Sequence, residues 1–427
     1  MNLLLRNGRD SQGNKIELWL KSGLVHRIGT DLQEATIDEM TQVIDCQEHL
    51  VIPGLVDLHV HLREPGGEYK ETIETGTKAA ARGGFTTICA MPNTNPVPDN
   101  AYTLRDILDK IDQTACVKVR PYASISQGLQ GQKLNNYPSL QEEGCVAFTD
   151  DGVGIQTAGM MLDAMEQVAA IDGIIVAHTE DNSLVHGGVV HQGRVSQRLG
   201  LPGIPSTAES VQIARDVLLS GQTGCRYHVC HVSTKESVSV IRWAKSQGYP
   251  VTAEVSPHHL VLDEGDIPGD DSHWKMNPPL RGRDDRQALL EGLLDGTLDC
   301  IATDHAPHSQ EEKNQTMLKA PFGIVGLEIA FQLLFTELVL PGKCSLAQLV
   351  EWLTIKPAQV FKLQAGQIVE GAPADITVID LEAQWQVDPQ AFLSKGKNTP
   401  FAGKALHSDI AMTLVDGKIV YHNQALI

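Results

Sequence analysis

The stretch Val51-Ile52-Pro53-Gly54-Leu55-Val56-Asp57-Leu58-His59-Val60-His61-Leu62-Arg63 joins an apolar run to two histidines one residue apart. Side chains at positions i and i+2 of a strand point to the same side, so His59 and His61 can hold one cation together. The alternative is a strand whose polar face carries two histidines by chance. The stretch therefore predicts a strand that ends in a candidate metal site.

Seven further apolar runs follow, separated by segments with helical patterns such as residues 69–82, which stop at the glycine pair Gly83-Gly84. Near-continuous apolar strands that alternate with helices indicate a parallel sheet, and eight such units indicate a closed (β/α)8 TIM-like barrel, an α/β fold. An open doubly wound sheet is the alternative, but no G-x-G-x-x-G pattern follows the first strand. The eight expected strands are 51–58, 85–91, 117–124, 145–149, 173–177, 225–230, 250–255 and 299–303.

The two ends of the chain differ from the middle because apolar and polar residues alternate there. Examples are Ile16-Glu17-Leu18-Trp19-Leu20 near the N-terminus and Asp375-Ile376-Thr377-Val378-Ile379 near the C-terminus, and Asp416-Gly417 is typical of a hairpin turn. We expect residues 1–50 and 365–427 to form one small β-sandwich beside a barrel domain of residues 51–364.

Composition restricts the function. The 427 residues include 53 Asp and Glu against 34 Lys and Arg, a formal net charge of -19, which argues against a nucleic-acid partner. The sequence contains no run of 18 apolar residues, so no membrane span is predicted. The apolar stretch at the N-terminus is too short for a signal peptide. The eight cysteines form no C-x-x-C pair, so we expect neither a zinc knuckle nor a dithiol site. A reducing cytoplasm is the expected compartment.

The candidate metal ligands share one position, the C-terminal end of a predicted strand. In a barrel these ends meet at one mouth, where active sites are built. Each residue alone could be a loop or core residue, and Asp150 is an alternative to Asp151 as the ligand after the fourth strand. The shared placement at strand ends nevertheless favours a single metal site. The six candidates are His59, His61, Asp151, His178, His231 and Asp304.

Six nitrogen and oxygen ligands exceed the needs of one tetrahedral zinc and suit two ions that share a carboxylate. Zinc fits imidazole and carboxylate ligands, with manganese or cobalt as alternatives. Such a site holds a bridging water as hydroxide and polarises a carbonyl, which predicts hydrolysis of an amide-like or ester-like bond. Asp304, at a metal and facing the substrate, is the expected proton shuttle.

Arg63 follows His61 by two residues, and its guanidinium there can bind a carboxylate through two hydrogen bonds. The alternative is a surface ion pair with Glu64 or Glu68.

Further polar residues are expected at the same mouth. Asn93 follows strand two and either contacts substrate or stabilises its turn; Asn277 follows strand seven, and His308 could add a contact to an anion. The polar segment 309–320 is a candidate mobile lid. We expect a structural or supporting role for His258, His259 and His305.

Two segments resemble the signatures of dihydroorotases. They are Asp57-Leu58-His59-Val60-His61-Leu62-Arg63-Glu64-Pro65 and Ala302-Thr303-Asp304-His305-Ala306-Pro307-His308, the latter followed by Lys313. Met91-Pro92-Asn93-Thr94 and Met276-Asn277-Pro278-Pro279-Leu280-Arg281 also resemble the family, in order. The resemblance covers essentially the whole chain and is to the longer, bacterial class I members of the amidohydrolase superfamily.

The resemblance implies reversible zinc-dependent hydrolysis of (S)-dihydroorotate to N-carbamoyl-L-aspartate in pyrimidine synthesis. It implies that the six candidate ligands hold two zinc ions and that Asp304 is the acid and base. It also implies a homodimer and an association with aspartate transcarbamoylase. The implied substrate contacts are His61, Arg63, Asn93, Asn277, His308 and the backbone at Phe322 and Gly323.

One position departs from many relatives, which bridge the metals with a carboxylated lysine after strand four. Here Phe148-Thr149-Asp150-Asp151-Gly152 contains no lysine, and class I members resemble this chain in using an aspartate. One occupied metal site is therefore an alternative to two. A hydantoinase, dihydropyrimidinase or allantoinase is the second candidate, but these usually carry the lysine and act on substrates without the carboxylate. A non-catalytic barrel that serves as a scaffold is the third, although such chains typically lose metal ligands.

Overall fold

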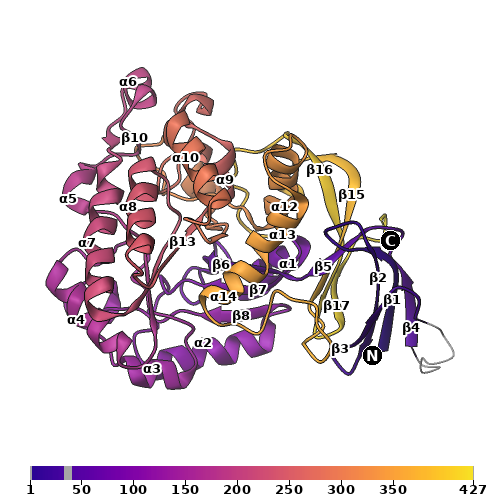
Figure 1. Ribbon diagram of the computed structural model, residues 1–427. Coiled ribbons are helices and arrows are strands. Elements are labelled where there is room, and N and C mark those ends of the chain that lie inside the picture. The colour runs from indigo at the N-terminus through magenta and orange to yellow at the C-terminus, as the bar shows by residue number, and fades with distance from the viewer. Residues whose placement is uncertain (1, 33–40, 427) are drawn as a thin grey trace.

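The computed structural model describes residues 2–32 and 41–426. Figure 1 shows a ring of strands surrounded by helices, and beside it a sheet that holds both ends of the chain. The ring carries the candidate site.

Parallel strands form the ring. β6, β7 and β8 make one sheet, and β9, β12, β13 and β14 make a second. The bounds are β6 (Leu55–Val60), β7 (Phe85–Ala90), β8 (Lys118–Pro121), β9 (Ile174–Ala177), β12 (Arg226–Val229), β13 (Val251–Val255) and β14 (Cys300–Ile301).

Bridges between single residues join the two sheets at both edges. Phe148, in the fourth expected strand, pairs with Ala123 on one side and Ile175 on the other, and Val60 pairs with His305 beyond β14. The fourth strand is thus reduced to a short bridging segment, and the order of the eight expected strands around the ring is kept.

Helices cover the outside of the ring (Figure 1). The longer ones are α1 (Ile73–Arg82), α2 (Ala101–Thr114), α3 (Tyr137–Glu143), α4 (Ala158–Ala169), α7 (Thr207–Thr223), α8 (Lys235–Ser246), α10 (Arg283–Leu294), α13 (Leu346–Leu353) and α14 (Ile355–Val360). Short elements at the mouth and near the terminal sheet are α5 (Asn182–Val185), β10 (Val190–His191), α6 (Arg194–Leu199), β11 (Gly203–Ile204), α9 (Pro257–Val261), α11 (Gln310–Lys313), η5 (Leu327–Ile329), α12 (Ala330–Leu334) and η6 (Phe335–Val339).

The first helix starts four residues later than the expected 69–82. Thr72 is its N-cap and forms a capping box with Thr75, which satisfies backbone N–H groups of the first turn. The helix ends at Arg82, before the expected glycine pair, where Gly84 has a φ of +86°. Local capping chemistry therefore sets both ends.

The two ends of the chain form one mixed sheet of eight strands, ordered β17-β16-β15-β5-β1-β2-β3 with β4 paired to β1. Side chains two residues apart, such as Leu3 and Leu5 or Ile376 and Val378, share one buried cluster, as the alternating pattern predicts. The bounds are β1 (Asn2–Arg9), β2 (Lys15–Lys21), β3 (Leu24–Gly29), β4 (Thr41–Asp45), β5 (Leu50–Pro53), β15 (Ile376–Gln386), β16 (Ala405–Val415) and β17 (Lys418–His422).

The expected first strand, 51–58, is two strands in the structure. β5 pairs with β15 in the terminal sheet, whereas β6 pairs with β7 in the ring. Gly54 lies between them, and a Cβ built there would come within 2.1 Å of the Thr86 side chain. Only glycine allows the chain to pass so close to β7 as it moves from one sheet to the other.

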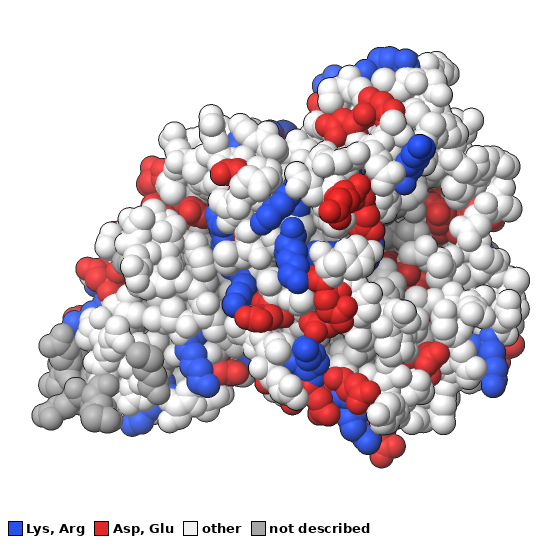
Figure 2. Space-filling model, turned by 180° about the vertical axis from the view of Figure 1, so that it is seen from behind, with Lys and Arg blue, Asp and Glu red and all other residues white. Residues whose placement is uncertain are grey.

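On the face shown in Figure 2, Lys and Arg side chains are interspersed with Asp and Glu and do not gather into one patch. Within residues 2–32 and 41–426, no helix has both the length and the apolar character needed to cross a membrane.

Candidate active site

The two histidines at the C-terminal end of β6, His59 within the strand and His61 directly after it, face two carboxylates from other strands. His59 Nε2 lies 3.5 Å from Asp151 Oδ1 and 3.4 Å from Asp304 Oδ1. His61 Nε2 lies 3.1 Å from Asp304 Oδ1 and 3.5 Å from Asp151 Oδ2. Residues separated by more than 240 positions in the chain thus meet at the carboxyl ends of the barrel strands.

His178 and His231 complete the group from the other side. His178 Nδ1 lies 3.0 Å from His231 Nε2 and 3.8 Å from Asp151 Oδ1. All six candidate ligands are at least nine-tenths buried. The structure therefore brings together every ligand that the sequence suggested.

The donor atoms form two groups that share one carboxylate. His59, His61 and Asp151 have ligand atoms within 4.8 Å of one another, and so do Asp151, His178 and His231. Three of these buried atoms, His59 Nε2, His231 Nδ1 and Asp151 Oδ1, have no hydrogen-bond partner among the described residues. Buried polar atoms are rarely left without a partner, so this donor set fits bound metal.

The two neighbouring aspartates after the fourth strand differ in direction. Asp150 accepts hydrogen bonds from the N–H groups of Ile125 and Ser126, at 2.8 and 3.0 Å, and from the Ser126 hydroxyl. Asp150 therefore holds the neighbouring loop, and Asp151 is the one that faces the histidines.

Two acceptors orient the first histidine pair. His59 Nδ1 donates to Glu254 Oε1 at 2.9 Å, and His61 Nδ1 donates to Asn93 Oδ1 at 2.9 Å. Such bonds leave the Nε2 atoms free for a metal. Glu254 also contacts His228 Nε2 at 3.1 Å. Sequence analysis missed Glu254, although an acidic residue within the apolar strand Val251–Val255 was a usable signal.

The charges around Asp304 favour its ionised form. Burial raises the pKa of this carboxyl, but the nearby His59 and His61 outweigh burial and lower it below the ordinary value. Asp304 has a left-handed φ of +51°, as do Arg63 (+61°) and His231 (+31°). Such backbone conformations in non-glycine residues are concentrated at functional sites.

A pocket of about 170 Å³ opens over the candidate ligands. It is lined by five of the six ligands, all except His59, and by all the other predicted substrate contacts. These contacts are Arg63, Asn93, Asn277, His308, Phe322 and Gly323.

Arg63 points its guanidinium into this region without a carboxylate partner. Nε donates to Pro307 O at 3.2 Å, and in the described part of the chain Arg63 makes no ion pair within 4.0 Å. Glu64 instead accepts from Ile73 N and pairs with Lys110, and Glu68 accepts from Gly66 N. The surface ion pair considered for Arg63 is therefore wrong, and its charge is available to a ligand.

His308 lies beside Arg63 as a neutral ring. Nε2 donates to Phe322 O at 2.8 Å, and Lys70 Nζ lies 3.4 Å from Nδ1. Burial and the charges of Arg63 and Lys70 lower the pKa of His308 to about 3. Gly323 must be a glycine, since its φ is +130° and a Cβ would come within 3.1 Å of His308 Nε2.

Asn277 presents an unused acceptor. Its amide nitrogen donates to Glu180 Oε2 at 3.1 Å, and its buried Oδ1 has no hydrogen-bond partner among the described residues. A substrate N–H could therefore bind at Oδ1.

The remaining expected residues lie outside the pocket lining. His305 Nδ1 accepts from Gly326 N at 3.2 Å, and His259 Nε2 lies 3.0 Å from Pro278 O. Lys275 Nζ donates to Met317 O and Ala320 O, both at 2.6 Å, and so ties down the end of segment 309–320. Motion of that segment stays a prediction.

Comparisons with known proteins agree with this geometry. A family described as Dihydro-orotase-like matches residues 48–237, and the Amidohydrolase family matches residues 324–421. The chain is 56% identical over 429 residues to the dihydroorotase of Enterococcus faecalis, covering 100% of both chains. It is 56% identical over 425 residues to that of Bacillus caldolyticus, covering 99% of both.

Solved structures of the same fold are hydantoinases and dihydropyrimidinases. The L-hydantoinase (dihydropyrimidinase) from Arthrobacter aurescens has a TM-score of 0.87 at 27% identity, covering 99% of this chain and 96% of that one. The dihydropyrimidinase from Brevibacillus agri has a TM-score of 0.85 at 24% identity, which shows the fold alone. The expected TIM-like barrel class is confirmed.

The barrel, the site at its mouth and these matches define a cyclic amidohydrolase, an enzyme that acts on a small molecule. Within that class, the chain belongs to the dihydroorotase family, since relatives more than half identical over their full length carry that name.

Proposed function

We propose that this enzyme hydrolyses (S)-dihydroorotate reversibly to N-carbamoyl-L-aspartate, the dihydroorotase reaction of pyrimidine synthesis. One observation carries the substrate assignment. Arg63, a guanidinium without an ion pair in the described chain, lines the same pocket as the two ligand groups that share Asp151. The substrate carries both groups that this arrangement can bind, a carboxylate and a ring amide.

The metal ligands proposed are His59, His61, Asp151, His178, His231 and Asp304, and their nitrogen and oxygen atoms suit two zinc ions. When bound, the zinc ions would activate a water and polarise the ring carbonyl. The chain's own residues then position the substrate and move the proton.

Each substrate contact has a separate role in this proposal. Arg63 and Asn93 donate to the carboxylate, and His308 donates its Nε2–H to it in place of Phe322 O when substrate is bound. Asn277 Oδ1 and the backbone at Phe322-Gly323 hold the ring amides. Asp304 is ionised at neutral pH, so it can accept the proton of the attacking water and deliver it to the leaving nitrogen. Reversal of these steps closes the ring.

A hydantoinase-type activity is the second candidate because of the fold match at 27% identity. Arg63 disfavours it, because a hydantoin offers no carboxylate to an otherwise unpaired cation. The aspartate in place of lysine after strand four also favours dihydroorotate.

Metal content measured together with turnover tests this function. We expect about two zinc ions per chain, as the two ligand groups suggest, turnover on dihydroorotate, and far less on hydantoin or allantoin. Asp304→Asn should nearly abolish turnover in both directions. Preferential turnover of hydantoin would transfer the assignment to the second candidate, and retained turnover in Asp304→Asn would remove Asp304 as the proton carrier.

A homodimer, an association with aspartate transcarbamoylase and a cytoplasmic location remain part of the proposal. All eight cysteines are unpaired, which supports a reducing compartment. Sedimentation of the chain alone and mixed with the transcarbamoylase would test both assemblies.

A further inference from the structure

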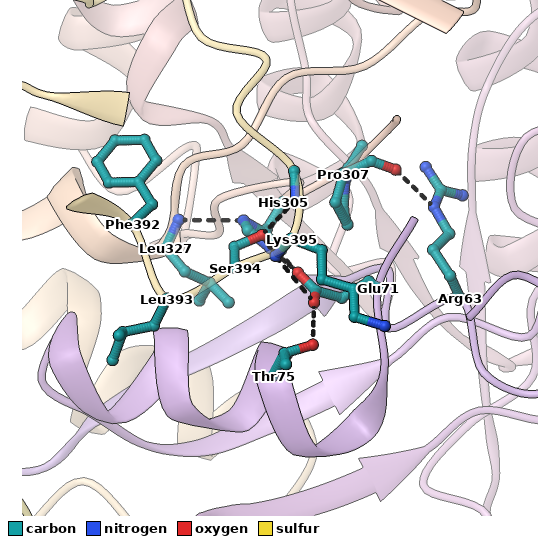
Figure 3. A network of polar contacts seen from close by, with 12 residues as sticks. Arg63, Glu71, Thr75, His305, Pro307, Leu327, Phe392, Leu393, Ser394 and Lys395 are labelled. Atoms are coloured by element: carbon teal, nitrogen blue, oxygen red, sulfur yellow. Dashed lines mark hydrogen bonds and ion pairs between the residues drawn. The ribbon is translucent and has the colours of Figure 1, made fainter. Parts of the chain in front are cut away.

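A segment from the C-terminal part of the chain passes beside the active site. We call residues 392–398, which lie within the connection from β15 to β16, the strap. Figure 3 shows Phe392, Leu393, Ser394 and Lys395 running past His305 and Glu71, with Arg63 and Pro307 nearby. The strap thus brings a distant part of the sequence next to residues that line the pocket.

Two buried carboxylates anchor the start of the strap to the barrel. Glu71 accepts hydrogen bonds from the Ser394 hydroxyl and, at 3.2 Å, from Lys395 N. Glu328 accepts from Leu393 N at 2.9 Å and Ser394 N at 3.0 Å. Hydrogen bonds to charged acceptors are among the stronger ones, so this end of the strap is well fixed.

Asn398 forms the other end of the strap, and its side-chain amide makes three hydrogen bonds to backbone atoms beside the pocket. Nδ2 donates to Ala306 O and to Gly323 O, both at 3.0 Å, and Oδ1 accepts from His308 N at 3.1 Å. Its own carbonyl accepts from Val325 N at 2.8 Å. Since two partners are carbonyls and one is an N–H, only one amide orientation satisfies all three.

These partners belong to two segments that meet at the pocket. Segment 305–308 carries His308, and segment 322–325 carries the Phe322-Gly323 backbone. Their direct backbone pairing is short, with Ala306 N donating to Ile324 O at 2.8 Å. Beyond that pairing two side chains join the segments: His308 Nε2 donates to Phe322 O at 2.8 Å, and Asn398 bridges Ala306 O, Gly323 O and His308 N.

We infer that Asn398 is a positioning residue for substrate binding. Together with the bond from His308 Nε2 to Phe322 O, it sets the spacing between His308 and the backbone at Phe322-Gly323, and so the width of the pocket that these residues line. This inference rests on the proposed function for the identity of the substrate, but the spacing itself follows from the contacts. Asn398 does not line the pocket itself, so it acts through His308 and Gly323, which do.

The decisive variant is Asn398→Asp, which keeps the shape and the acceptor for His308 N but loses both N–H donors. We expect KM for dihydroorotate to rise roughly ten- to hundredfold, since each hydrogen bond of this kind contributes about one order of magnitude or less. Turnover number should change by no more than about threefold and zinc content not at all, because neither a ligand nor Asp304 moves. Leu393→Ala is the matched control, being on the strap but 42% exposed, and should leave KM unchanged.

Hydrogen exchange gives a readout that needs no turnover. The Asn398→Asp enzyme with zinc bound should show faster exchange at the amides of 306–308 and 323–325 than the Leu393→Ala enzyme, and equal exchange elsewhere in the barrel. If the wild type does not turn over dihydroorotate, the proposed function fails, but the exchange pattern still decides whether Asn398 holds the two segments.

Several outcomes would overturn the inference. They are an unchanged KM, unchanged exchange, or a parallel loss of turnover number, zinc content and thermal stability, which would indicate a general structural role. Should Asn398→Asp not fold, Ser394→Ala loosens the strap at its other anchor. That variant should raise KM in the same direction by a smaller factor, and an unchanged KM in a folded Ser394→Ala enzyme would equally overturn it.

Discussion

At the scale of single residues, several side chains of the site use one polar atom on a neighbouring residue and keep a second atom or a charge unpaired. Asn277 uses its amide nitrogen on Glu180 and keeps an unpaired oxygen. His59 uses Nδ1 on Glu254 and keeps Nε2. Arg63 uses Nε on Pro307 O and keeps its charge. The unused atoms are those that face the pocket or the ligand groups, so the polar contacts of the fold also define what the site can bind.

Arg63→Ala should raise KM for dihydroorotate by roughly 10- to 100-fold, the range for a lost hydrogen-bonded charge pair. Zinc content should be unchanged, because Arg63 contacts Pro307 and His308 and no proposed ligand. Steady-state kinetics and metal analysis of the same preparation measure both. Arg105→Ala, which removes a surface ion pair with Glu143, is the control. An unaltered KM would take Arg63 out of the substrate site.

At the scale of elements, the connection from β5 to β6 decides where the ligand-bearing strand lies. Gly54 separates a strand of the terminal sheet from the first strand of the barrel. The close approach to Thr86 on β7 places β6 beside β7, and thereby His59 and His61 at the mouth.

Gly54→Ala should destabilise the enzyme by about 1–3 kcal/mol, because the new methyl group overlaps the Thr86 side chain. Adding Thr86→Ala should restore part of that loss. The Thr86 hydroxyl is buried without a hydrogen-bond partner among the described residues, so Thr86→Ala alone costs mainly its buried methyl group, roughly 0.5–1.5 kcal/mol.

Thermal unfolding at fixed zinc concentration measures these changes. Gly159→Ala is the matched control, since a Cβ there meets nothing within 4 Å and the residue lies in α4. That control should leave the enzyme equally or slightly more stable. Additive effects of Gly54→Ala and Thr86→Ala would contradict the close contact.

At the scale of the whole molecule, the C-terminal part is connected to the barrel through buried charge. Glu328 accepts the N–H groups of Leu393 and Ser394, and Arg82 lies 3.5 Å from its Oε2. Burial raises the pKa of Glu328 to about 6, despite these hydrogen bonds. The carboxyl therefore binds a proton more tightly in the folded protein than in the unfolded chain, where the ordinary value is 4.5.

This shift gives the sign of a pH dependence. A raised pKa stabilises the fold when the group is protonated, below about pH 4.5, and the contribution is lost as pH rises through about 6. The shift corresponds to about 2 kcal/mol. Relative to wild type, Glu328→Gln should therefore gain about that much unfolding free energy as pH rises across this window. Denaturant unfolding of both proteins at a series of pH values would show it, and parallel curves would contradict the shift.

Local pattern was enough for much of the fold and for the candidate ligands. Apolar runs predict the barrel strands because both faces of such strands are buried, and alternation predicts the terminal sheet because one face is. His59, His61, His178, His231 and Asp304 lie at or within three residues of strand ends, so the sequence predicts that they meet at one mouth. The division of 51–58 at Gly54 was missed, since the clash that requires glycine involves Thr86 on another strand.

Tertiary structure alone decided which polar groups serve which partners. Asp150 and Asp151 are chemically identical neighbours, and only the loop at Ile125 and Ser126 assigns the first to support and leaves the second for the histidines. Glu254 lies 195 residues from His59, and Asn398 lies 90 residues from His308. The strands and the side chains at their ends could be predicted from the sequence, because periodicity and strand termini are local properties. The hydrogen bonds that orient those side chains join residues far apart in the chain, so they exist only once the barrel and the strap are packed together.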